Sequence, residues 1–112
     1  MHKLIILFYE PPDLDAFERR WSEEFVPRAE RMPGLRRVAV SRVLGGLDEK
    51  APDLHLIHEL YFDDRETLES AMASEAGQEA GAFLVAIAGE RAQLLFAEHH
   101  EDIPRPSKRE QD

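Results

Sequence analysis

The sequence HKLIILFY, residues 2–9, carries six large, mainly apolar side chains in succession and is followed by Pro11 and Pro12. Short aliphatic and aromatic runs that end at prolines are typical of β-strands. Because successive side chains of a strand point to opposite faces of its sheet, both faces of this strand are apolar. The two sets are Leu4, Ile6 and Phe8 on one face and Ile5, Leu7 and Tyr9 on the other. The sheet that contains this strand therefore needs cover on both sides.

Three further stretches read as strands, and two regions between them have helical periodicity. The strands are predicted over residues 35–44, 53–62 and 91–99, with a long hairpin loop from Gly45 through Pro52. The order β-α-β-β-α-β, with the helical segments 64–88 counted as one layer, is the ferredoxin-like arrangement. The predicted fold class is therefore α+β, with a four-stranded antiparallel sheet and helices on one face.

The first helical region has one apolar face, formed by Leu14, Phe17, Trp21 and Phe25. These residues recur at three- and four-residue steps, which is the period of a helix. Asp13 or Asp15 supplies a carboxylate that caps the first amide protons. Pro27 predicts a kink because it lacks an amide proton, and Pro33 with Gly34 predicts the end of the helix.

The second helical region divides into two segments. Asp63, with Glu66 three residues later, resembles a capping box. Ser74 is placed to cap the next segment, which Gly89 closes. The side chains predicted to face inward are Leu68, Ala71 and Met72 in the first segment and Ala80, Phe83, Leu84 and Ile87 in the second.

The sheet face away from the helices carries about six large apolar side chains, Ile57 and Tyr61 among them. Leaving them in water would forgo on the order of 10 kcal/mol, at about 1.5–3 kcal/mol for each side chain. That free energy is comparable to the stability of a whole domain. The simplest cover is a second copy, packed sheet against sheet in a two-fold dimer. A small helical lid or a partner protein is the alternative.

The composition is that of an acidic globular domain. The 112 residues fit one domain, predicted over residues 1–102, with a flexible polar tail over residues 103–112. The net charge of −9 argues against nucleic-acid binding, and the absence of cysteine excludes disulfides and thiolate sites. No segment approaches the roughly 20 apolar residues of a membrane span, and the first strand lacks a signal-peptide cleavage site. A cytoplasmic location is therefore expected.

With these features the chain resembles the EthD family of the dimeric α/β-barrel superfamily. The resemblance rests on the first strand that ends in prolines, the pattern F-x-x-x-W-x-x-x-x-x-P, and the segments MPGLRR (32–37) and HELYFDDRETLESAMAS (58–74). It implies a homodimer in which two ferredoxin-like units close their sheets into a barrel, without a cofactor. Relatives include cofactor-independent enzymes that act on lactones or polycyclic aromatics, and proteins linked to the degradation of ether or aromatic compounds.

Two positions depart from the family pattern. The family helix has a histidine where this chain has Phe25, and often a tyrosine after GLRR where this chain has Val38. Histidine transfers protons near neutral pH, whereas a phenyl ring does not. We therefore expect a more apolar pocket, lined by Tyr9, Trp21, Phe25, Val38 and Tyr61. Plain core packing of Trp21 and Phe25 is the alternative.

Glu59 is the candidate catalytic residue. It shares a strand face with Tyr61, and this face is the one assigned to the barrel interior. A partly desolvated carboxylate there serves as a base or orients a ligand. The alternative is a structural ion pair with Arg37 or Arg91.

The histidines are not predicted to form a metal site. His55 and His58 point to opposite faces of one strand, so they cannot share an ion. His99 and His100 are adjacent at a strand end, where neighbouring side chains again diverge. His58 is expected to pack under the helices with its hydrogen bonds satisfied.

The sequence is compatible with three functions. The first is a module that binds a small hydrophobic or aromatic metabolite in a catabolic pathway. The second is a cofactor-independent isomerase, cyclase or monooxygenase that uses Glu59 as its base, with Tyr9 or Tyr61 in support. The third is a structural or accessory dimer with a packed interior and no ligand. The resemblance favours the first and leaves catalysis undecided.

Overall fold

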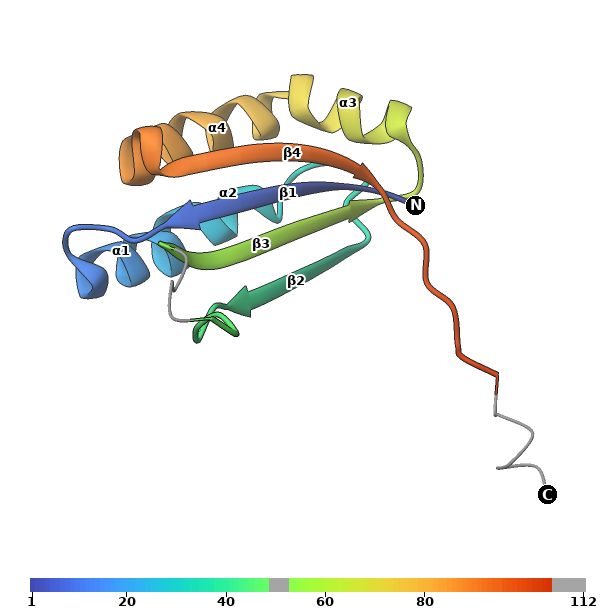
Figure 1. The fold of residues 1–112 in the computed structure, drawn as a ribbon. Coiled ribbons are helices and arrows are strands. Elements are labelled where there is room, and N and C mark those ends of the chain that lie inside the picture. The colour runs from blue at the N-terminus through green and yellow to red at the C-terminus, as the bar shows by residue number, and fades with distance from the viewer. Residues whose placement is uncertain (49–52, 106–112) are drawn as a thin grey trace.

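The computed structural model describes residues 1–48 and 53–105 of the chain. It contains a four-stranded sheet in the order β2-β3-β1-β4, in which every neighbouring pair is antiparallel (Figure 1). The strands are β1 (His2–Tyr9), β2 (Arg37–Arg42), β3 (Leu54–Phe62) and β4 (Ala92–Glu98). All four lie within the predicted stretches. Parts of the predicted hairpin loop and C-terminal tail, residues 49–52 and 106–112, lie outside the described residues.

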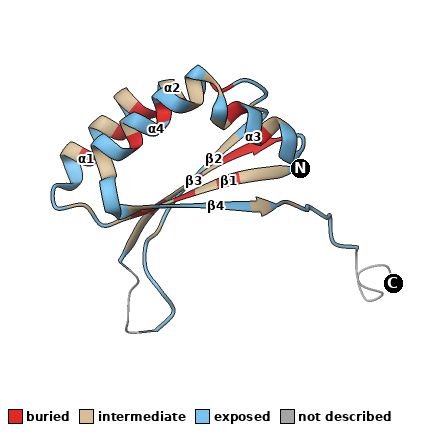
Figure 2. Ribbon diagram, turned by 90° about the horizontal axis from the view of Figure 1, so that it is seen from above, coloured by how far each residue is buried: buried red, intermediate tan, exposed pale blue. Residues whose placement is uncertain are grey.

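The helices lie on one face of the sheet, and no described segment covers the other face (Figures 1 and 2). They are α1 (Leu14–Arg20), the π-helical turn η1 (Trp21–Phe25), α2 (Val26–Ala29), α3 (Arg65–Ala73), α4 (Glu75–Ala88) and the 3-10 turn η2 (Gly89–Arg91). This arrangement confirms the predicted ferredoxin-like fold. Within residues 1–48 and 53–105, no helix has the length and apolar character that crossing a membrane requires.

The first helical region departs from α-helical geometry in its middle. Asp13 caps it, because its carboxylate accepts a hydrogen bond from the amide of Ala16 at 3.1 Å. From Trp21 to Phe25 the backbone forms a π turn, in which the amide of Val26 donates to the carbonyl of Trp21. The sequence predicted a kink at Pro27, whereas the structure places the irregularity in the turn just before it. A wider turn there relieves the clash between a proline ring and the preceding helical turn.

The second helical region confirms two predicted caps and corrects a third. The N-cap of α3 is Asp64, whose carboxylate accepts an amide hydrogen bond from the first turn at 2.8 Å. The spacing to Glu66 had pointed to Asp63, but the backbone of Asp64 is still extended, so the helix begins one residue later. Ser74 caps α4 as predicted, and Gly89 ends it with a φ of +53°.

The core lies between the sheet and the helices, and the strands alternate as predicted. In β1, Leu4, Ile6 and Phe8 are buried toward the helices, while the residues between them are partly exposed. We call the face away from the helices the open face. Its main side chains are Ile5, Leu7, Tyr9, Ile57, Glu59, Tyr61 and Leu95. Most of this face is apolar, so the structure reproduces the predicted need for cover on both sides of the sheet.

Candidate functional site

A small apolar cavity lies between α4, the π turn and the sheet. Its volume is about 40 Å³, and every lining residue is apolar, including Ile6, Phe25, Leu60, Gly81 and Leu94. Gly81 on α4 is exposed, and Leu94 on the edge strand β4 is 40% exposed. The mouth of the cavity therefore lies between α4 and β4. We call it the helix-side cavity.

Phe25 separates this cavity from a buried histidine, His58. The Phe25 side chain is only 2% exposed, and its ring meets the His58 ring edge-on with centroids 5.8 Å apart. On another side, the Trp21 ring lies 5.3 Å from the same imidazole, and its Nε1 donates a hydrogen bond to His58 Nδ1 at 3.3 Å. The π turn carries both Trp21 and Phe25 and so holds them against His58.

His58 is fully buried but has only one hydrogen-bond partner among the described residues. The indole nitrogen of Trp21 is always a donor, so Nδ1 of His58 must be the acceptor. Burial lowers the pKa of His58 to about 4, so the ring is neutral near pH 7. The single ring proton therefore lies on Nε2, and no atom of residues 1–48 or 53–105 accepts it. The sequence placed His58 correctly under the helices but predicted satisfied hydrogen bonds, which is wrong for Nε2.

Glu59 lies on the open face and forms an ion pair with Lys3 at 2.5 Å. Neither Arg37 nor Arg91, the partners considered from the sequence, contacts it. Lys3 lies on the neighbouring strand β1, two residues before Ile5, the register partner of Glu59, and its hydrogen bond to Glu59 raises the pKa of Lys3. Tyr61, on the same face, is 4% exposed; the guanidinium of Arg37 lies 4.2 Å from its ring centre, and the His99 ring meets it edge-on at 4.8 Å.

The predicted site residues are not brought together, because the sheet lies between them. Trp21 and Phe25 pack on the helix side with His58, and Val38 pairs with Leu60 and shares that side. Tyr9, Glu59 and Tyr61 belong to the open face, where the Tyr9 hydroxyl donates to Gln93 at 2.9 Å. The structure therefore offers two groups of candidate residues, one on each face of the sheet.

The sequence predicts His55 on the face of β3 opposite to His58, but the structure turns it toward α1. The pairing of β1 with β3 shifts register between Phe8 and Tyr9, opposite the start of β3. Such an irregularity re-aims the neighbouring side chain. His55 contacts α1 as a result, with its Nε2 2.9 Å from the Glu18 carboxylate and its ring 5.9 Å from the ring of Phe17.

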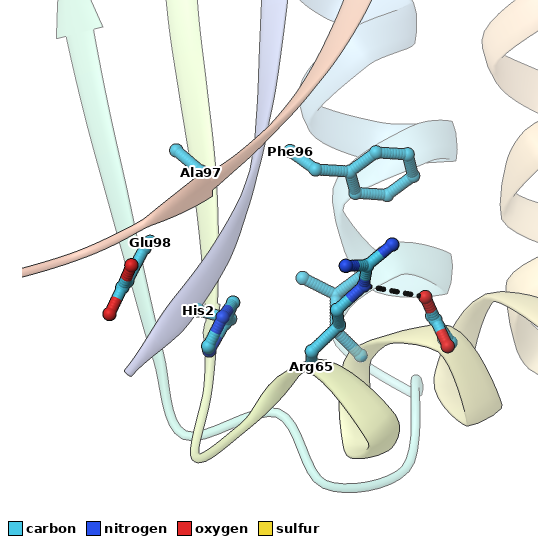
Figure 3. Close-up of a pocket in the computed structure, with 7 residues that line it drawn as sticks. His2, Arg65, Phe96, Ala97 and Glu98 are labelled. Atoms are coloured by element: carbon cyan, nitrogen blue, oxygen red, sulfur yellow. Dashed lines mark hydrogen bonds and ion pairs between the residues drawn. The ribbon is translucent and has the colours of Figure 1, made fainter.

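A larger hollow, of about 370 Å³, lies where the end of β4 meets α3 (Figure 3). Phe96, which is 64% exposed, and Arg65 border it, and Arg65 is paired with Glu69 at 2.9 Å. His2 and Glu98 complete its rim. None of these residues was a predicted site residue. In the described part of the chain, no group of three histidine or acidic side chains is placed to hold a metal ion.

The sequence pattern of the EthD domain family matches residues 10–86. An uncharacterized 11.0 kDa protein from the thcB-thcC intergenic region of Rhodococcus erythropolis is 28% identical over 104 residues, covering 93% of this chain and all of that protein.

Two solved structures extend the comparison. An ethyl tert-butyl ether d (EthD) family protein from Bacillus halodurans is 32% identical, with a TM-score of 0.85, covering 89% of this chain and 99% of that one. A dimeric ferredoxin-like protein of unknown function from Jannaschia sp. is 17% identical, with a TM-score of 0.62, covering 88% of this chain and all of that one. The second likeness concerns the fold alone.

Proposed function

The chain belongs to the EthD family, and from this premise we propose that it binds or converts a small hydrophobic or aromatic metabolite in a catabolic pathway. The observation that carries the proposal is the helix-side cavity, which is apolar throughout and opens between α4 and β4. Cavities with apolar walls and few polar groups are typical of sites for hydrophobic ligands. Phe25, at the position of the histidine in the family pattern, makes this cavity more apolar.

Binding is favoured over catalysis by the positions of the proton-transferring groups. The wall at Phe25 has no titratable atom, and Glu59 lies on the opposite face of the sheet in an ion pair with Lys3. The alternative is a cofactor-independent isomerase, cyclase or monooxygenase in which Glu59 acts as the base from the open face. The substitution Glu59→Gln tests this alternative, because turnover that survives it rules out a Glu59 mechanism. A third reading, an accessory dimer without a ligand, predicts no binding at all.

We further propose a homodimer through the open face. Ile5, Leu7, Ile57 and Leu95 form an apolar surface that no described segment of the chain covers. A second copy that packs sheet against sheet would bury this surface, and the fold is shared with a dimeric ferredoxin-like protein. Sedimentation velocity tests the interface with the substitution Ile57→Lys, which should convert dimer to monomer. Val85→Lys is the matched control, because Val85 is 70% exposed on α4 and should leave the dimer intact.

Binding is measured best through Trp21, the only tryptophan of the chain. Its ring contacts His58, which in turn contacts the cavity wall at Phe25, so a ligand in the cavity should change its emission. Titration with toluene, anisole or cyclohexanone should give a saturable change. Gly81→Leu should abolish it, because the larger side chain fills the cavity mouth. Ala82→Leu, also exposed on α4 but outside the cavity, is the matched control. A native protein that responds to none of these compounds would refute the proposal.

A further inference from the structure

The helix-side cavity and the buried face of His58 belong to one region of the molecule. His58 lies on the same face of β3 as Leu60, and it pairs across the ladder with Ile6 of β1. Both Leu60 and Ile6 line the cavity. The ring of Phe25 lines the cavity and also packs against the imidazole. Phe25 is therefore in contact with both the cavity and the histidine.

We propose that the Nε2–H group of His58 is the polar contact of a ligand site that Phe25 closes, and that the ligand is a compact apolar molecule with one ether or carbonyl oxygen. This inference rests on the proposed function and names its ligand class. The position of the ring proton supports it, since the hydrogen bond from Trp21 occupies Nδ1 and leaves on Nε2 a buried proton that no described residue accepts.

The unpartnered Nε2–H of His58 favours ligands that carry a neutral hydrogen-bond acceptor. A buried donor without an acceptor is unfavourable, so a ligand that supplies an acceptor binds more tightly than a ligand of the same shape that does not. An ether or ketone oxygen accepts a hydrogen bond and brings no proton of its own that would need a partner. A single neutral N–H donor in apolar surroundings does not offset the desolvation of a carboxylate, so anionic ligands are disfavoured.

Phe25 acts as a gate because the cavity is too small when its ring is in place. A volume of about 40 Å³ is far below the roughly 300 Å³ of the smallest typical ligand pockets. Displacing a phenyl ring adds space of the order of a benzene molecule and brings the ligand against His58. Phe25 lies at the end of the π turn, and such turns are frequent at functional sites.

The test compares anisole with ethylbenzene, two probes of nearly the same shape that differ in an ether oxygen against a methylene group. The native protein should bind anisole about fivefold more tightly, which corresponds to one neutral hydrogen bond. His58→Leu should remove this preference while still binding both probes. Equal affinities in the native protein would overturn the inference and leave the proposed function standing. A preference that survives in His58→Leu would also overturn it. No binding of either probe would refute the proposed function as well.

The gate and the proton position have their own tests. Phe25→Ala should tighten binding of both probes by about tenfold and keep the preference for anisole, because the closing ring is gone. Phe25→Leu serves the same purpose if the alanine variant does not fold. Unchanged affinity in the folded variant would refute the gate.

The ¹⁵N chemical shifts of the His58 ring identify its tautomer. A proton on Nδ1 instead of Nε2 would overturn the inference without any ligand.

Discussion

Acid should destabilise this protein through His58, because the fold keeps that ring neutral. The pKa of His58 falls from 6.5 to about 4 on burial. Between these values the unfolded chain binds a proton that the folded chain excludes, so stability falls as the pH falls through this window. Above about pH 6.5 protonation of His58 costs the protein no stability. Across the whole window the free energy of unfolding falls by about 3 kcal/mol, and roughly 2 kcal/mol of this is already lost at about pH 5.

Urea unfolding followed by Trp21 fluorescence measures this effect at about pH 7.5 and about pH 5, at one protein concentration because a dimer would make stability concentration-dependent. His58→Leu is the control, since it has no group to titrate at this position. The carboxylates titrate in both proteins, so they cancel in the comparison. The native protein should lose about 2 kcal/mol more than the variant between the two pH values. The same pH dependence in both proteins would refute the reasoning about His58.

Two pairs of substitutions, each measured by urea unfolding, test the helix geometry. Gly81→Ala should stabilise the protein by about 0.5–1 kcal/mol, because a Cβ there meets nothing within 4 Å and alanine favours a helix. Gly77→Ala should destabilise it by roughly 1–3 kcal/mol, because the new Cβ would lie 2.2 Å from the carbonyl oxygen of Ala71. Asp64→Ala should cost about 1 kcal/mol through loss of the cap, and Asp63→Ala less than about half of that. Equal effects within either pair would contradict the structure.

Most of the fold could be predicted from the sequence because the large side chains of the strands follow a clear alternating pattern. In β1 and β3, large side chains alternate between two sides, so the layers and the uncovered face follow from the pattern alone. Local geometry was harder to predict. The cap at Asp64 was placed one residue early because two adjacent aspartates fit the same motif. The effect of Pro27 was predicted, but a kink and a π turn satisfy the same constraint.

The candidate site was less predictable because it depends on pairing and on partners distant in sequence. Val38 was assigned to a pocket with Tyr61, but β2 pairs so that Val38 lies opposite Leu60 on the helix side. Only the register of β2 against β3 settles which face Val38 takes. Likewise, the free Nε2 of His58 follows from the hydrogen bond of Trp21 to the other ring nitrogen. No local pattern around His58 carries that information.

A crystal structure of the protein grown with anisole would show directly where the ligand binds, because it locates the probe on one face of the sheet or the other. We expect anisole in the helix-side cavity, with the Phe25 ring displaced and the ether oxygen within hydrogen-bond distance of His58 Nε2. Anisole bound only on the open face, or a closed cavity at saturating probe concentration, would contradict this expectation.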